Sequence, residues 1–205
     1  MTFVFMRHGR TDYNAHHLLQ GQTEIPLNAE GIQEAREVRK ELQKDGYHFD
    51  RVISSPLGRA VQTAAFASGF TADRISTDPR LIEIGFGPME GVPASELGGE
   101  MQKFFQDPVH YEPPQGAESY QSLLKRLQNF LDSYLLNTSG ETVLALSHGA
   151  ALHAVYLLLT GKSLEHFWDV PIGNCGYFEV SNSSGHWEIV SEHMHGEAWV
   201  PYTKE

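Results

Sequence analysis

The 205-residue chain has very little cysteine and no long apolar run. Its single cysteine, Cys175, excludes a disulfide within the chain, and we expect this thiol to be a small buried group. Nowhere do 18 apolar residues follow one another, so the sequence predicts no membrane-spanning helix. The opening residues MTFVFMR lack the positive stretch and long apolar run of a signal peptide. We therefore expect a cytoplasmic protein with no membrane partner.

Positive charge is also scarce. The chain has 15 Lys plus Arg against 26 Asp plus Glu, which gives a net charge of −11. Such a balance disfavours nucleic acid as a partner, and it means that any site for an anion must be a local positive pocket. No biased or repeated tract occurs, and 40% of the residues are hydrophobic. A single compact domain over residues 1–205 is the expected organisation.

The first third of the chain predicts alternating strands and helices. An unbroken apolar run at 2–6 is typical of a buried strand. A helix is expected after it, with Asn28 as N-cap and Gly46 as the stop signal. Its buried face is predicted from apolar residues at helical spacing, namely Ile32, Ala35, Val38 and Leu42. This pattern indicates a β-strand followed by a packed helix.

A second strand is predicted at 51–55, and the helix after it is expected to have Ser55 as N-cap and Pro56 as first helical residue. A short strand is predicted at 74–77. The segment 85–118 differs from the rest because it is rich in Gly and Pro. We interpret it as a cap inserted into the fold.

The last third of the chain contains the strongest helical pattern, which begins after Ser119. Its apolar face is predicted to comprise Tyr120, Leu123, Leu124, Leu127, Phe130, Leu131, Tyr134 and Leu135. A buried strand (ETVLALS), a helix ending at Gly161 and two late strands (GYFEVS and HWEIVSE) follow. Together, the elements predict an α/β fold, a three-layer α/β/α sandwich with a mainly parallel central sheet and an inserted cap region.

Polar residues follow three of these predicted strands. Arg7 and His8 come after the first, Arg59 lies in the first turn of the helix after the second, and His148 follows ETVLAL. Ligands of such sheets gather at the carboxyl ends of the strands, where helix N-termini add positive dipole ends. Each residue alone is typical of an ordinary strand end. Together they predict an anion site, and phosphate suits the guanidinium groups.

Five segments in this order resemble the histidine phosphatase superfamily, in the branch of phosphoglycerate mutases and related small phosphatases. They are MRHGRTDYN, GQTEIPLNAEG, VISSPLGRAVQTA, LIEIGFGPMEG and LALSHGA. The resemblance covers nearly the whole chain. It implies that His8 is the nucleophile and forms a phosphohistidine. It also implies that Arg7, Arg59 and His148 hold the phosphoryl oxygens, and that Asn14 binds the same group.

The resemblance places Glu83 at the position of the general acid. A protonated carboxyl group there would donate to the leaving oxygen, and the carboxylate would then activate water. Glu90 is the second candidate for this role, and Asp12 is a more distant one.

Three further residues are expected on the substrate side of the site. Gln22 and Gly149 are candidate binding residues. Arg10 departs from the family, which usually carries an acidic or amide residue there. It is expected either to be a solvated or ion-paired residue or to enlarge the positive mouth of the site.

The resemblance implies a phosphatase acting on a small phosphorylated metabolite, because the stretch between Glu83 and His148 is shorter than in the mutases. The alternatives are phosphoglycerate mutase-type transfer and a non-catalytic module that binds a phosphorylated ligand. No cofactor or metal is expected, and a homodimer is a candidate assembly. Six cap residues are expected either to line the leaving-group side or to form a small core of the cap: Phe86, Met89, Met101, Phe104, Phe105 and Tyr111.

Overall fold

A computed structural model describes residues 1–135, 140–182 and 186–195. Within these residues the chain forms a six-stranded sheet in the order β3-β2-β4-β1-β5-β6. The strands are β1 (Thr2–Arg7), β2 (Arg51–Ser54), β3 (Ile75–Thr77), β4 (Thr142–Ser147), β5 (Tyr177–Ser181) and β6 (Glu188–His193). Parallel pairing joins β1 with β4, β4 with β2 and β2 with β3, whereas β5 is antiparallel to β1 and to β6. The predicted mainly parallel sheet is confirmed.

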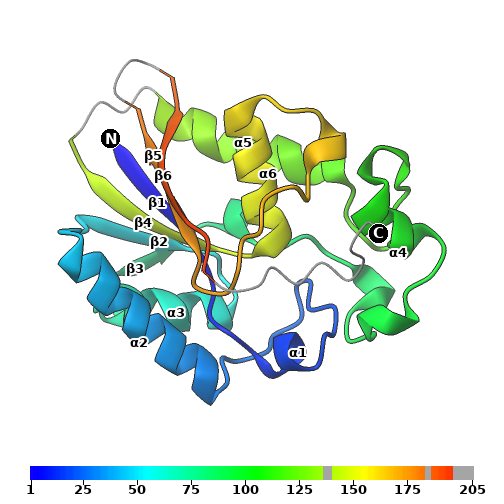
Figure 1. The fold of residues 1–205 in the computed structure, drawn as a ribbon, viewed down its shortest axis with the longest axis horizontal. Coiled ribbons are helices and arrows are strands. Elements are labelled where there is room, and N and C mark those ends of the chain that lie inside the picture. Colours follow the sequence, from blue (N-terminus) through cyan, green and yellow to red (C-terminus); the bar gives the residue numbers. More distant parts are fainter. Residues whose placement is uncertain (136–139, 183–185, 196–205) are drawn as a thin grey trace.

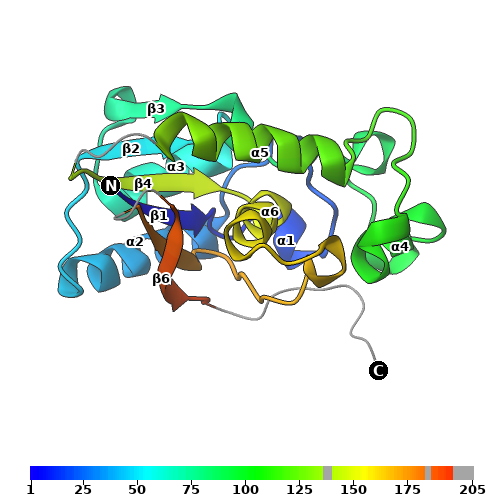
Figure 2. The same cartoon turned by 90° about the horizontal axis from the view of Figure 1, so that it is seen from above.

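Helices cover both faces of this sheet (Figures 1 and 2). One face packs against α2 (Ala29–Lys44) and α3 (Gly58–Ser68), and the other packs against α5 (Tyr120–Leu135) and α6 (Gly149–Thr160). The alternation along β1 explains how one strand serves two cores, since Val4 and Met6 join the α2 side and Phe3 and Phe5 join the α5 side. The predicted three-layer sandwich is confirmed.

Most helix signals in the sequence act as predicted. The Asn28 side chain accepts a hydrogen bond from the Gly31 amide at 2.9 Å and so caps α2. Gly161 ends α6 in the left-handed conformation. On α5, the predicted apolar face is buried or half-buried, although the side chain of Leu135 lies outside the described part.

The start of α3 differs from the prediction. The sequence favours Ser55 as the N-cap and Pro56 as the first helical residue, whereas α3 begins at Gly58 with Leu57 as its N-cap. The Ser55 hydroxyl lies 2.7 Å from Nε2 of His148. The prediction of the helix start is wrong: the Ser55 hydroxyl accepts from the Leu57 amide at 3.3 Å and also contacts His148, 93 residues away, while the helix itself begins only at Gly58.

The 85–118 segment consists of short helical pieces. These are α4 (Glu100–Gln106) and 3-10 turns at Gly87–Met89, Ala94–Glu96 and Pro108–His110. They lie beyond the end of the sheet, next to the start of α5 (Figure 1). Phe104 is fully buried here and stacks on Tyr120 of α5, with ring centroids 4.9 Å apart. Aromatic packing therefore fixes this segment to the main body.

The remaining short elements are α1 (Asp12–Ala15) and 3-10 turns at Ala72–Arg74, Pro79–Leu81 and Leu164–His166. Cys175 is buried, as the sequence predicts. Among the described helices, none is long and apolar enough to cross a membrane.

Candidate active site

Three strand ends meet at one edge of the sheet. β1, β4 and β2 are neighbours, and their register places Arg7 beside Ser147 and Ser54 beside Leu146. Because the strands are parallel, the residues that follow each of them emerge at the same edge. This arrangement brings together the predicted segments around His8, Arg59 and His148.

The loop after β1 is pressed against α2 by two glycines. A Cβ atom on Gly31 would lie 2.0 Å from the carbonyl oxygen of Arg10, and one on Gly9 would lie 2.6 Å from the carbonyl oxygen of Gly31. Any side chain at either position would push the loop away from the helix. The two glycines therefore hold the loop that carries His8 close to α2.

His8 is 2% exposed, and its Nδ1 lies 2.8 Å from the carbonyl oxygen of Gly9. A carbonyl oxygen only accepts hydrogen bonds, so Nδ1 carries the ring proton and Nε2 keeps its lone pair. Burial holds the pKa of His8 well below its usual value, and the nearby Arg59 and Arg7 guanidinium groups lower it further. The ring is therefore a neutral imidazole at neutral pH, with Nε2 available to attack.

Two arginines bring positive charge to this histidine. Arg7 donates from Nη1 to the carbonyl oxygen of Ile172 at 2.7 Å. Arg59 is fully buried and donates to the carbonyl oxygens of Thr23 at 2.8 Å and Gly21 at 2.6 Å. Burial lowers the pKa of Arg59 to about 10, so the group remains charged at neutral pH. The Nε atoms of both arginines are buried without a hydrogen-bond partner in the described structure.

His148 packs against His8, with ring centroids 5.0 Å apart. It is fully buried, and its Nε2 lies 2.7 Å from the Ser55 hydroxyl. Burial, together with the nearby Arg59 charge, holds the pKa of His148 well below its usual value. Its Nδ1 has no partner among the described residues. Three buried nitrogens, one from each sheet-edge segment, are thus unpaired, and an anion would satisfy them.

Glu83 occupies the N-terminus of α6. Its carboxylate accepts from the amides of Ala150 at 3.2 Å, Ala151 at 3.0 Å and Ile84 at 2.9 Å. Burial raises the pKa of Glu83, and this outweighs the opposing effect of these amides and of Arg59. The helix end therefore orients this carboxyl group instead of facing an external anion. A carboxyl group with a raised pKa is suited to donate a proton and later to accept one.

A cavity of about 620 Å³ extends from these groups toward the 85–118 segment. Arg7, His8, Arg59 and Glu83 line its charged part. Its outer wall is aromatic, with Phe86, Phe105 and Trp168 among the lining residues.

The six apolar cap residues divide between the two predicted roles. Phe86 and Phe105 line the cavity, whereas Met101, Phe104 and Tyr111 are buried in the core of the cap. Met89 is half-buried against that core.

Three of the predicted binding residues line this cavity. Asn14 accepts from the Thr11 amide through Oδ1 at 3.1 Å, so its amide NH2 is the end suited to a ligand. Arg10 lines the cavity and also forms an exposed ion pair with Glu30 at 3.4 Å, so it combines the two predicted environments. At Gly149, a Cβ atom would lie 3.6 Å from both Arg7 and Glu83, which is ordinary contact.

Three other predicted residues lie apart from the cavity lining. Gln22 donates from Nε2 to the carbonyl oxygen of Glu83 at 2.9 Å and so supports the acid loop from behind. The Glu90 carboxylate accepts from the amides of Gln22 at 2.9 Å and Phe86 at 3.1 Å, and it also binds the Thr23 hydroxyl. Asp12 is exposed in the first turn of α1. Of the carboxylates considered as the acid, Glu83 alone lines the cavity.

Sequence reasoning missed several residues that hold the site. Thr63 accepts from the Gly9 amide at 3.0 Å and donates to the carbonyl oxygen of Arg59 at 2.7 Å. Asn174 donates to the carbonyl oxygen of His8 at 2.9 Å. The spacing of four residues between Arg59 and Thr63 is a local signal for the contact with the Arg59 carbonyl oxygen. No local signal reveals Asn174, because it lies 166 residues from His8.

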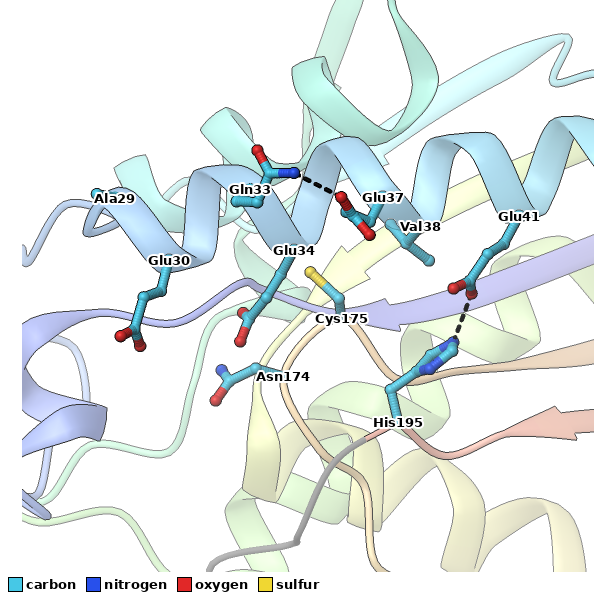
Figure 3. A pocket seen from close by; sticks show the side chains of 10 residues that line it. All are labelled: Ala29, Glu30, Gln33, Glu34, Glu37, Val38, Glu41, Asn174, Cys175 and His195. Carbon is cyan, nitrogen blue, oxygen red and sulfur yellow. Dashed lines mark hydrogen bonds and ion pairs between the residues drawn. The ribbon is translucent and has the colours of Figure 1, made fainter.

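A second cavity of about 690 Å³ lies along α2 (Figure 3). Four glutamates of that helix line it, together with Asn174, Cys175 and His195. His195 pairs with Glu41 at 3.0 Å, as Figure 3 shows. In the described residues, neither this cavity nor any other place has a cluster of three or more His, Cys, Asp or Glu side chains that could hold a metal ion.

Comparisons with known proteins agree with this geometry. Residues 3–194 match the histidine phosphatase superfamily (branch 1). A putative phosphoserine phosphatase 2 from Hydrogenobacter thermophilus is 32% identical over 179 residues, which cover 85% of this chain and 86% of that protein. A probable phosphoglycerate mutase GpmB from Yersinia enterocolitica is 32% identical over 192 residues, covering 91% and 88%.

A solved structure has the same fold. It is a mutant phosphoserine phosphatase from Entamoeba histolytica in complex with phosphoserine, and it superposes with a TM-score of 0.82 at 28% identity. The match covers 94% of this chain and 96% of that one. The chain therefore belongs to branch 1 of the histidine phosphatase superfamily.

Proposed function

We propose that the protein hydrolyses phosphomonoesters of small metabolites through a phosphohistidine on His8. The observation that carries this proposal is the neutral, buried imidazole of His8, which is placed between two arginines that have unpaired Nε–H groups. Such a group is a nucleophile directed at an anionic electrophile. The family of the chain and the names of its relatives support the same reaction class.

In the first step, Nε2 of His8 attacks phosphorus, and the bond from phosphorus to the leaving oxygen breaks. Arg7, Arg59 and His148 hold the three equatorial oxygens through their free N–H groups. Glu83, whose carboxyl pKa is raised by burial, gives its proton to the leaving oxygen. The Gly9 carbonyl oxygen accepts from Nδ1–H and stabilises the positive charge that develops on the ring.

In the second step, water attacks the phosphohistidine. Glu83, now ionised, takes a proton from that water as the new bond to phosphorus forms. The bond from phosphorus to Nε2 breaks, and His8 returns to the neutral ring while phosphate leaves. Asn14 and Arg10 line the path of exit and entry, and we assign them to binding.

Phosphoglycerate mutase-type transfer is the second candidate, because one relative bears that name. We favour hydrolysis because the 85–118 segment is short and the solved relative with phosphoserine is a phosphatase. Phosphoserine is accordingly the first compound to test. A module that only binds a phosphorylated ligand is the third candidate, and the nucleophile, two arginines and acid in one cavity argue against it.

We also propose that residues 1–205 form one domain in which 85–118 is an inserted cap. A homodimer and a cytoplasmic location stay predictions from the sequence.

The experiment that tests this function compares the wild type with His8→Ala on phosphoserine and on p-nitrophenyl phosphate. We expect kcat to fall by at least about a thousandfold, because the nucleophile is lost. Quenching in alkaline denaturant during turnover of a radiolabelled phosphomonoester is expected to trap a phosphoenzyme that is stable in base and labile in acid, in the wild type alone. Equal rates from both proteins would disprove the role of His8.

Product analysis separates the candidates. Release of inorganic phosphate from phosphoserine supports hydrolysis, whereas dominant interconversion of 2- and 3-phosphoglycerate supports the mutase. Tight binding of phosphate without any turnover would support the binding module.

A further inference from the structure

His153 has two acceptors around its ring. It lies on α6, is 5% exposed and lines the wall of the site cavity. Its Nδ1 is 2.7 Å from the carbonyl oxygen of Gly149, and its Nε2 is 2.8 Å from the carbonyl oxygen of Val170. Both partners only accept hydrogen bonds, and both distances are those of real hydrogen bonds.

A neutral imidazole cannot satisfy this arrangement, because it has only one N–H group. One of its nitrogens would then direct a lone pair at a carbonyl lone pair across less than 3 Å. An imidazolium donates at both nitrogens and satisfies both carbonyls. It would also lie against the Trp168 ring, whose centroid is 4.6 Å from that of His153, which favours a cation.

Neighbouring groups both raise and lower the pKa of His153. Burial lowers the pKa of His153 to about 4 and the Arg7 charge adds to this effect, although the two carbonyl oxygens raise the pKa. Other ionisable groups at this end of α6 include His148, its N-cap residue, Glu83, which accepts from the Ala150 amide, and Tyr120, which accepts from Trp168 at 3.0 Å. We give the geometry precedence, since both short contacts need a proton.

The contact to Val170 holds a segment that reaches two parts of the site. This segment, residues 164–172, follows α6 in the chain. Two residues beyond Val170, the carbonyl oxygen of Ile172 accepts from Nη1 of Arg7 at 2.7 Å. Two residues before it, the Trp168 indole donates to the carbonyl oxygen of Phe104 in the cap at 2.9 Å. His153 is thus the point that joins α6, Arg7 and the aromatic wall.

We propose that His153 is a positioning residue that, as an imidazolium, fastens the 164–172 segment to α6 and so fixes Arg7 and Trp168 in the site. Its kinetic consequences rest on the proposed phosphatase function. The contact is complete below the pKa of the folded-state imidazolium and is lost as the pH rises through that value. An arginine at this position would keep the positive charge and more than one donor at every accessible pH.

The kinetic test compares His153→Gln with His153→Arg. We expect H153Q to lower kcat/KM roughly tenfold to a hundredfold, because Arg7 loses its fixed orientation. H153R is expected to recover most of this loss. The kcat/KM of H153R should still fall at alkaline pH as Glu83 loses its proton. The additional fall that the wild type shows when His153 loses its proton should be absent. The matched control is His166→Gln in the same segment, where His166 is exposed and pairs with Asp169 at 2.7 Å.

We expect the kcat/KM of H166Q to stay within about twofold of the wild-type value, because exposed ion pairs contribute little to stability. Wild-type kinetics from H153Q would overturn the proposal. The proposal would also be overturned if H153R recovered no activity and its kcat/KM declined at alkaline pH in the same way as that of the wild type.

A second measurement uses the wild type alone, so it does not depend on whether a variant folds. Nitrogen-15 NMR of the histidine rings at pH 7 is expected to show both nitrogens of His153 protonated. A single protonated nitrogen would overturn the proposal. If the wild type hydrolyses no phosphomonoester, the proposed function fails, whereas this spectrum still tests the imidazolium.

Discussion

Two cavities in the described part of the chain are similar in size and differ in chemistry. The site cavity, at about 620 Å³, has Arg7, His8 and Arg59 in its wall. The cavity along α2, at about 690 Å³, is lined by glutamates that face it from one helix (Figure 3). Volume alone would favour the second one. Buried nitrogens without hydrogen-bond partners, rather than cavity volume, therefore identify the site for an anion.

Two of the glutamates in the α2 cavity pair with other residues that line it. Glu37 accepts from Gln33 at 2.5 Å, and Glu41 pairs with His195 at 3.0 Å. In the site cavity, by contrast, nitrogens of Arg7, Arg59 and His148 are buried and unpaired. Burying donors without partners is costly, so a place that keeps three of them is arranged for a ligand. Repulsion between like charges also keeps anions away from the α2 cavity.

Among the variants that test this comparison, Arg59→Lys is expected to have the largest effect on activity. Lysine keeps the charge but loses the planar fork that binds Gly21, Thr23 and the phosphoryl oxygens. We expect kcat/KM for phosphomonoesters to fall by roughly a hundredfold or more, measured by steady-state kinetics. Arg51→Lys is the matched control, because Arg51 pairs with Glu141 at the other end of β2. Equal losses from both variants would contradict the assignment of Arg59.

A smaller effect, dependent on the substrate, is expected from Glu83→Gln. Glutamine cannot donate the proton that a poor leaving group needs, so the rate on phosphoserine should fall roughly a hundredfold. The rate on p-nitrophenyl phosphate, whose leaving group needs little help, should fall much less. Because burial raises the pKa of Glu83, the acid form persists to higher pH than for an exposed carboxyl group. Wild-type activity on phosphoserine should therefore decline as the pH rises through that value.

The control for this prediction is Glu90→Gln. Glu90 supports the loop by accepting from the Gln22 and Phe86 amides and does not line the cavity. Any loss in this variant should be the same for both substrates. If Glu90→Gln, and not Glu83→Gln, made the rate depend on the leaving group, Glu90 would be the acid.

The smallest effect is expected in the other cavity, from Glu37→Gln. Glu37 is exposed, accepts from Gln33 and forms a long ion pair with Lys40 at 3.8 Å. We expect kcat to stay within about twofold and the free energy of unfolding to change by no more than about 0.5 kcal/mol. Kinetics and urea denaturation measure these quantities. A large loss of phosphatase activity would mean that the α2 cavity takes part in the reaction, and the contrast between the cavities would fail.

Much of the fold could be predicted from local patterns. Apolar runs and helical spacing predict the strands and helices, because β1 buries both of its faces in the two cores, whereas α2 buries one face and exposes the other. The α3 start could not be predicted in the same way. The Ser55 hydroxyl accepts from the Leu57 amide and also contacts His148, a residue 93 positions away that no local pattern reveals.

By itself, the sequence determined the layered α/β fold and the segments that carry Arg7, His8, Arg59, Glu83 and His148. Spacing and motif order are properties of the chain, so they can be read before it folds. The tertiary structure alone decided which nitrogens stay unpaired, which helix end orients Glu83, and that His153 faces two carbonyl groups. Those features depend on burial and on contacts between distant residues, and no local pattern specifies them.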